Sequence, residues 1–207
     1  MDLHRGTVES IKRHLELDPS LYEETVDDEI KWKGRIFSAD LLKVRLPDGS
    51  YGTREIAWHH GGCGVAAFRE GKLCLVRQYR VALGCMTLEI PAGKLAPGED
   101  PLACAERELK EETGFTAQKM AYLTTIATSA GFADELIHIY MATGLKLAES
   151  SPDADEFINV DLVDVGELVD AVLDGRIEDA KTVVGALICD AVSRRLDPGP
   201  VPEDQQQ

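Results

Sequence analysis

Four glutamates and an arginine lie close together in the segment GKLAPGEDPLACAERELKEETGF, which begins at Gly93. A compact fold would bring these acids around one small volume. They are Glu99, Glu108, Glu111 and Glu112. Carboxylates packed so closely raise one another's pKa unless a cation neutralises them. Arg107 supplies one positive charge, and a divalent metal would neutralise the group better. A ligand set made only of oxygens favours magnesium or manganese over zinc.

The same segment carries signals for both ends of a helix. Asp100 is a favourable N-cap, and Pro101 suits the first helical position. Gly114 is typical of a C-terminal stop. These signals predict a helix from Asp100 to Thr113, about four turns long.

A helical wheel places the acids beside the expected core. Leu102, Ala105 and Leu109 form one apolar stripe. Glu108 and Glu112 lie at the edge of this stripe, and Glu111 follows on the solvent side. A solvated helix face with ordinary i,i+4 ion pairs is the alternative interpretation. It is less favoured, because the acids border the apolar stripe and follow a loop of glycine and proline.

The composition excludes several classes of partner. The chain has 207 residues, is 44% hydrophobic and carries a net charge of −15, which indicates a globular protein without the basic surface that nucleic acids or anionic membranes require. A small-molecule partner is favoured. No membrane span or signal region is recognisable, so a cytoplasmic location is expected. The five cysteines contain no C-x-x-C pair and are expected to be buried free thiols.

The remaining sequence predicts strands mixed irregularly with helices. An amphipathic stretch around Val8 and Ile11 could be a short helix, and from Ile30 the runs IKWKGRIF, LLKVRL and TREIAWHH predict a β-meander. Further strands are expected at GVAAF, KLCLVRQYR, TLEIPAG, AYLTTIAT, ELIHIYMATGL and FINVDLV, with closing helices at 165–173 and 180–196. The pattern predicts an α+β fold or mixed-sheet sandwich, with an N-terminal region at 1–58, a main domain at 59–197 and a disordered tail at 198–207.

The charged segment resembles the box of the Nudix hydrolase family, G-x5-E-x7-R-E-U-x-E-E-x-G-U, where U is a large apolar residue. Every position fits: Gly93, Glu99, Arg107, Glu108, Leu109, Glu111, Glu112, Gly114 and Phe115. Seven fixed identities at average residue frequencies would match by chance about once in 10⁸ starting positions. The resemblance implies an α/β/α sandwich with a mixed sheet, and metal-dependent cleavage of a nucleoside diphosphate linked to another moiety.

The stretches REIAWHHGGCGVAAF, LVRQYR, LEIPAGKL and TSAGFADELIHIYMATGL are similar to the ADP-ribose pyrophosphatase branch of that family. The resemblance implies hydrolysis of ADP-ribose to AMP and ribose 5-phosphate. Ala130 stands where the branch usually has proline, so another nucleotide sugar, such as GDP-mannose or a UDP-sugar, stays open as substrate. A nucleoside triphosphate sanitising enzyme is a further alternative, and a nucleotide sensor without catalysis is the least favoured one.

The resemblance also assigns roles to residues. Glu108 and Glu112 would be the principal ligands of magnesium or manganese, and Glu111 and the Ala92 carbonyl would contribute. Arg107 would orient the carboxylates, and Glu99 would support the box loop or a bridging water at the metal. The residues that match substrate-contacting positions are Arg54, Arg80 and Glu135.

Chemistry at the diphosphate also needs a base that activates water. The resembling branch uses a glutamate on the loop before the last strand, here AESSPDADEFI. Glu156 fits best, and Glu149 and Asp155 fit less well. Such a loop could close over bound substrate and bring its carboxylate to the attacking water. His59, His60 and His138 are expected to have structural roles.

Members of the resembling branch are homodimers in which N-terminal strands cross to the partner. Here the segment from Ile30 to Arg54 is the candidate for this exchange. Trp32, Phe37 and Trp58 could form the contact, stack on a base or be buried in the core.

Overall fold

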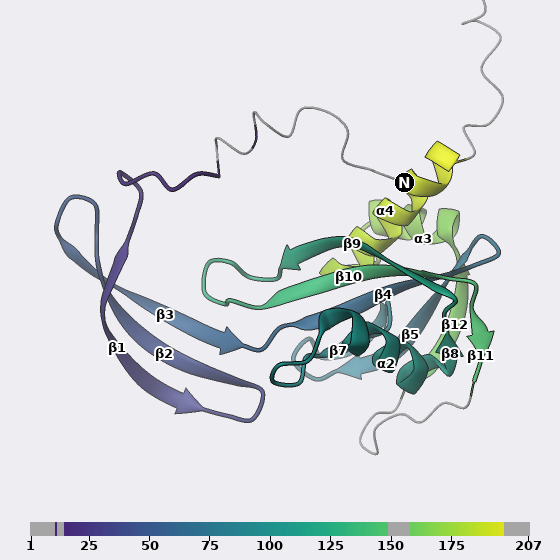
Figure 1. Ribbon diagram of the computed structural model, residues 1–207, viewed down its shortest axis with the longest axis horizontal. Helices are drawn as coiled ribbons and strands as arrows, with labels where there is room; N and C mark the ends of the chain where they lie inside the picture. The colour runs from purple at the N-terminus through teal and green to yellow at the C-terminus, as the bar shows by residue number, and fades with distance from the viewer. Residues whose placement is uncertain (1–10, 12–14, 149–157, 197–207) are drawn as a thin grey trace, which may run out of the picture. The chain divides into compact units, whose positions relative to one another are not determined.

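The computed structural model describes residues 11, 15–148 and 158–196 (Figure 1). The helix predicted around Val8 lies mostly outside these residues, and the predicted tail at 198–207 lies entirely outside them. The chain forms two compact units, Met1–His59 with Gly131–Ala133, and His60–Ala130 with Asp134–Gln207. The domain boundary that we placed after residue 58 stays a prediction.

The first unit contains the predicted meander, which is confirmed as three antiparallel strands in the order β1-β2-β3. Their bounds are Glu24–Lys33, Phe37–Arg45 and Tyr51–His59. A tight turn joins β2 to β3, where the Asp48 carboxylate accepts a hydrogen bond of 2.9 Å from the Ser50 amide. Gly49 in this turn has a φ of +84°, which favours glycine.

Two sequence-based expectations for this unit were wrong. IKWKGRIF is not one strand, because the chain turns between Lys33 and Phe37. The Trp32 ring folds over Gly34, where a Cβ would lie 1.9 Å from it, and packs on Phe37 with ring centroids 4.7 Å apart. This packing stabilises the turn. In addition, the predicted strand TREIAWHH included His60, whereas β3 ends at His59.

The second unit is built on a mixed seven-stranded sheet. Its main order is β12-β5-β4-β10-β9, β6 pairs with β5 and β7 pairs with β4. Strands β4 and β10 are parallel, and the other pairs are antiparallel. The strand bounds are β4 Gly62–Arg69, β5 Lys72–Arg80, β6 Cys85–Glu89, β7 Ala92–Lys94, β9 Lys119–Ala127, β10 Leu136–Thr143 and β12 Asn159–Asp164; β8 Phe115–Thr116 and β11 Lys146–Leu147 pair separately.

Helices cover both faces of this sheet (Figure 1). Alternating strand residues point to opposite faces. Val65 and Tyr140 therefore pack with α2, Pro101–Thr113, whereas Ala66 and Ile139 pack with the other two helices. These are α3, Val165–Leu173, and α4, Ala180–Leu196, both at the predicted positions. The arrangement is the expected α+β sandwich with a mixed sheet.

The expected strand TLEIPAG is divided in two. Strand β6 ends at Glu89, and β7 begins at Ala92 and pairs with a different neighbour, β4. Pro91 has no amide hydrogen, and the Ile90 amide donates instead to Thr182 Oγ1 on α4 at 2.8 Å. The chain therefore leaves one strand partner and joins another just before the charged segment.

The cysteines follow the prediction with one exception. All five are free thiols, and four are buried, but Cys85 is exposed. Burial raises the pKa of the Cys74 and Cys189 thiols to about 12. Buried thiols of raised pKa are poor nucleophiles, which agrees with a packing role.

Candidate active site

Helix α2 carries most of the predicted site, and its caps are those read from the sequence. The Asp100 carboxylate accepts from the amides of Leu102 and Ala103 at 2.9 and 3.2 Å. Gly114 ends the helix with a φ of 70°. The predicted apolar stripe needs one correction, since Leu102 is 38% exposed, and the buried position in the first turn belongs to Cys104.

Gly93 allows the loop backbone to approach this helix closely. A Cβ built at this position would lie 1.8 Å from Glu108 Oε1, so any side chain would collide with that carboxylate. Glycine at this position therefore lets the Glu108 carboxylate lie against the loop backbone, and a side chain here would displace that carboxylate. The loop and the helix are fitted to each other at the most acidic point of the segment.

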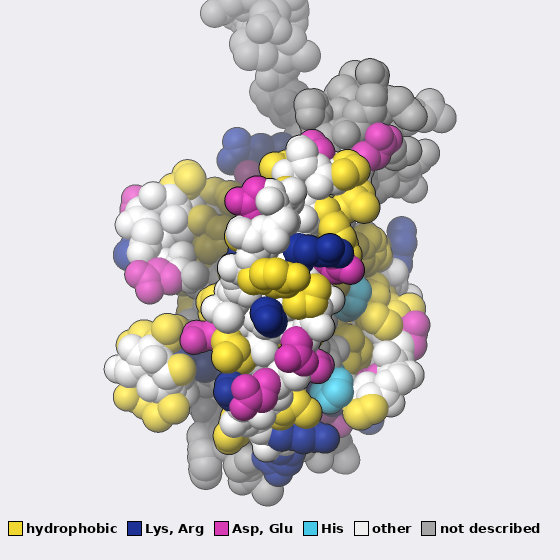
Figure 2. Space-filling model, turned by 90° about the vertical axis from the view of Figure 1, so that its left-hand side faces the viewer, with side chains coloured by type: hydrophobic (Ala, Val, Ile, Leu, Met, Phe, Trp, Pro, Cys, Tyr) yellow, Lys and Arg dark blue, Asp and Glu magenta, His cyan; other side chains and the backbone are white. Residues whose placement is uncertain are grey.

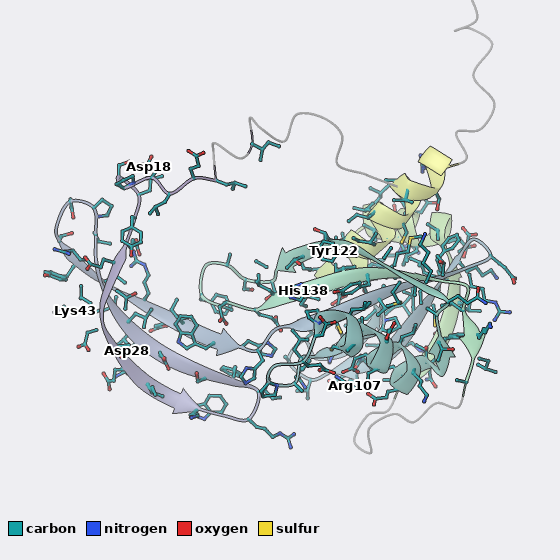
Figure 3. The ribbon with its side chains drawn as sticks, viewed as in Figure 1. Asp18, Asp28, Lys43, Arg107, Tyr122 and His138 are labelled. Atoms are coloured by element: carbon teal, nitrogen blue, oxygen red, sulfur yellow. The ribbon has the colours of Figure 1, made fainter. Side chains whose placement is uncertain are left out.

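Arg107, which is labelled in Figure 3, donates hydrogen bonds to three of the four acids. Its Nε lies 3.1 Å from Glu99, and its Nη1 lies 2.7 Å from Glu108 and 2.8 Å from Glu111. The hydrogen bonds that Arg107 donates to Glu99 and the neighbouring glutamates raise the pKa of Arg107, although burial opposes this shift. The guanidinium therefore stays charged and fixes the directions of these carboxylates, which is the arrangement expected of an orienting residue.

Glu99 ties the loop to the helix. One of its oxygens accepts from the Ala96 amide at 2.8 Å, while Arg107 donates to both oxygens. The hydrogen bonds from Arg107 and Ala96 lower the pKa of Glu99. This carboxylate thus links the loop backbone at Ala96 to the side chain of Arg107 on the helix.

Glu108 and Glu112 are the buried acids of the helix, with exposures of 9% and 5%. They are one turn apart, and Glu112 accepts from the Ala92 amide at 2.9 Å. Carboxylates beside the backbone of Ala92 and Gly93 form a donor set of oxygens, which suits magnesium or manganese. Among the described residues, no three acidic, histidine or cysteine side chains converge in the manner of a closed metal centre. The residues present fit the cation by the chemistry of their donor atoms, which are all oxygens.

Arg80 stands at the end of β5 and is held by a buried acid. Its Nε and Nη2 each lie 2.7 Å from an oxygen of Glu89. The charge of Glu112 helps to raise the pKa of Arg80, so this predicted substrate contact lies within electrostatic range of the candidate metal ligands. Sequence reasoning gave no role to Glu89, although it lies in the stretch LEIPAG that the resemblance includes.

The other predicted site residues are distributed more widely. Glu135 belongs to the same unit as Arg80 and accepts from Thr128 Oγ1 at 2.8 Å. Arg54 belongs to the other compact unit, where it pairs with Glu23. The candidate bases Glu149, Asp155 and Glu156 lie outside the described residues.

His138 has local partners that agree with a structural role. Its Nδ1 lies 2.8 Å from Thr125 Oγ1, which in turn lies 2.8 Å from the Tyr122 hydroxyl. His138 and Tyr122 come from the neighbouring strands β10 and β9 (Figure 3).

Comparison with known proteins decides the family. The sequence model of the NUDIX domain matches residues 58–184, which include the whole loop and helix described above. The chain belongs to the Nudix family. It is 42% identical over 165 residues to the methanol dehydrogenase activator of Bacillus methanolicus, covering 78% of this chain and 89% of that protein. It is 41% identical over 166 residues to the ADP-ribose pyrophosphatase of Bacillus subtilis, covering 79% and 90%.

A solved structure supports the fold of this Nudix hydrolase. The crystal structure of an ADP compounds hydrolase superimposes with a TM-score of 0.77, at 20% identity, over 87% of this chain and 99% of that chain. Within the described residues, no helix is long and apolar enough to cross a membrane.

Proposed function

We propose that this Nudix hydrolase cleaves the diphosphate bond of a nucleoside diphosphate sugar, with ADP-ribose as the preferred substrate and AMP and ribose 5-phosphate as products. The observation that carries the proposal is the complete Nudix box folded as one loop and helix around Arg107. The similarity to an ADP-ribose pyrophosphatase over 79% of the chain favours the substrate. A cytoplasmic location would match a soluble metabolite of this kind.

The residues of the Nudix box would hold the metal ion that hydrolysis requires. Glu108, Glu112, Glu111 and the Ala92 carbonyl would hold magnesium or manganese, with Glu99 supporting the loop or a bridging water. The bound ion would polarise phosphoryl oxygens and lower the pKa of the attacking water.

Arg107 keeps the carboxylates in fixed directions, and Arg80 binds the diphosphate through the donors that Glu89 does not use. Glu135 and Arg54 are proposed as further substrate contacts. Glu156 accepts the proton of the attacking water, which displaces the nucleotide in line.

Substrate preference is tested by comparing kcat/KM for ADP-ribose, GDP-mannose, UDP-glucose, NADH, a diadenosine polyphosphate and a nucleoside triphosphate with magnesium. We expect ADP-ribose to be turned over best. Ala130 is exposed on the loop before β10, and proline there would fix φ and stiffen the loop. Ala130→Pro should therefore increase the preference for ADP-ribose over the other sugars several-fold. A tenfold preference for the triphosphate over every sugar nucleotide would contradict the substrate class and leave the hydrolase family intact.

We also propose a homodimer in which residues 30–54 contribute to the partner's nucleotide site. Large apolar side chains are exposed on the strands of the first unit, among them Ile30 at 63%, Trp32 at 50% and Phe37 at 41%. On the face shown in Figure 2, hydrophobic side chains lie among acidic and basic ones.

Sedimentation at micromolar concentration should give a dimer for the native chain. Ile30→Asp should shift it toward monomer and reduce activity, because a charge would enter the proposed interface. Leu173→Asp is the matched control, since Leu173 is 73% exposed at the end of α3, outside the candidate segment. A fully active monomer would refute the dimer.

A further inference from the structure

Glu89 is a buried carboxylate with partners on both oxygens. Its side chain is 2% exposed. Oε1 accepts from Arg80 Nε at 2.7 Å and from Thr87 Oγ1 at 2.6 Å. Oε2 accepts from Arg80 Nη2 at 2.7 Å and from Lys181 Nζ at 2.5 Å. Two cations from different elements, β5 and α4, therefore share one anion.

Lys181 comes from the first turn of α4 and is also buried, with 8% of its side chain exposed. Besides Glu89 it contacts Asp179 Oδ1 at 2.8 Å. The other oxygen of Asp179 accepts from the amide and hydroxyl of Thr182, and that hydroxyl accepts from the Ile90 amide. The start of α4 thus contacts two consecutive residues just before the Nudix loop. Lys181 binds the side chain of Glu89, and Thr182 binds the backbone of Ile90.

Arg80 is the exposed member of this network, with 43% of its side chain accessible. A guanidinium has five N–H donors in a planar fork. Glu89 takes one from Nε and one from Nη2, which leaves the Nη1 edge directed away from this carboxylate. The acid therefore determines the plane in which the remaining donors lie.

The network also sets the net charge beside Arg80. Burial alone would favour the neutral acid, but hydrogen bonds from Arg80 and the charge of Lys181 outweigh it and hold the pKa of Glu89 at about 2. Glu89 is therefore an anion at neutral pH. Arg80 and Lys181 balance Glu89 and Asp179, whereas without Lys181 the group would carry one excess negative charge beside the proposed diphosphate ligand.

We propose that Lys181 is a positioning residue for diphosphate binding, which acts through Glu89 to fix the plane and preserve the positive charge of the Arg80 guanidinium. This inference rests on the proposed function in one respect, namely that Arg80 contacts the diphosphate. Lys181 itself is buried behind Glu89 and does not contact the substrate.

The direct test is Lys181→Met, which keeps the length of the side chain and removes its charge. We expect KM for ADP-ribose to rise about tenfold, with kcat within about twofold of native, because ground-state binding of the diphosphate is weakened. Lys181→Arg should retain most of the native KM. The control is Arg77→Met on the same strand, since Arg77 is exposed and is 3.9 Å from its ion-pair partner Asp161. This control should leave KM unchanged.

A double-mutant cycle separates positioning from general loss of stability. If Lys181 acts through Arg80, Lys181→Met should add little to the KM of Arg80→Met. A full additional rise in KM in that background would overturn the proposal. The proposal would also be overturned if Lys181→Met had a lowered melting temperature and a lowered kcat but a native KM, because a purely structural role would give that result.

A second variant keeps the test decisive if Lys181→Met does not fold. Glu89→Gln with Lys181→Met removes both buried charges together, which folds tolerate better than removal of one. Its KM should rise as well, and a native KM would contradict the proposal.

Binding of ADP with magnesium, measured by calorimetry, gives a readout without turnover. If the native protein does not hydrolyse ADP-ribose but Lys181→Met binds ADP more weakly than the native protein does, the proposed substrate is refuted and the positioning role is supported. If the native protein hydrolyses ADP-ribose but Lys181→Met binds ADP as tightly as the native protein does, the proposed substrate is supported and the positioning role is refuted. A native protein that neither binds ADP nor hydrolyses ADP-ribose would overturn both.

Discussion

Glu112→Gln is expected to lower kcat by on the order of 10²–10³-fold while the protein stays folded. Glutamine has nearly the volume of glutamate, and its carbonyl oxygen can still accept from the Ala92 amide, which lies 2.9 Å from the native carboxylate. The charge that would hold the metal is lost. Activity measured against magnesium concentration, together with a melting curve, separates the loss of metal binding from the loss of fold.

Glu108→Gln should behave in the same way, and Glu106→Gln is the matched control. Glu106 is on the same helix, but it is exposed and takes no part in the Arg107 cluster. It should keep native kcat and native magnesium dependence. If Glu112→Gln or Glu108→Gln keeps native turnover at limiting magnesium, the proposed metal ligands are wrong.

Glu156→Gln is expected to reduce kcat by roughly 10²–10⁴-fold and to leave magnesium affinity nearly unchanged. A general base acts on the water proton and contributes little to holding the cation, so catalysis and metal binding should separate. Glu149→Gln on the same loop serves as the control and should have a much smaller effect. Steady-state rates across a magnesium titration measure both quantities for each variant.

Equal and negligible effects of both loop substitutions would move the base elsewhere. Glu111 and Glu99 are then the next candidates. Both carboxylates are hydrogen-bonded to Arg107 in the structure, at 2.8 and 3.1 Å. A base at either position would therefore have to act from within the charged cluster of the helix and loop.

The parts of the site that sequence could predict are those fixed by local interactions. The limits of α2 follow from Asp100, Pro101 and Gly114, whose effects on the backbone extend over one helical turn. The two acids at the edge of the apolar stripe follow from helical periodicity. Leu102 shows the limit of this reasoning. Helical periodicity predicts the face of the helix on which Leu102 lies, but it does not predict whether another element covers that side chain, which is 38% exposed.

The parts that sequence could not predict depend on contacts between distant elements. The ion pair of Glu89 with Lys181 has no local pattern, because a buried glutamate in a strand and a lysine in a helix each resemble surface residues. The runs TLEIPAG and IKWKGRIF each predicted one continuous strand in spite of Pro91 and Gly34. The new partner strand of β7 and the Trp32 ring that packs over Gly34 become evident only from the fold.

The anchoring of β6 by the start of α4 has a consequence for the order in which the enzyme is made. Glu89 and Lys181 are 92 positions apart, as are Ile90 and Thr182. A ribosome adds residues from the N-terminus, so all the residues of the Nudix box leave it well before α4 does. Until that helix emerges, Glu89 has no second cation and the Ile90 amide has no acceptor on α4. A nascent chain therefore carries the complete Nudix box before it can assemble the network that holds Arg80, and the proposed diphosphate-binding end of the site matures last.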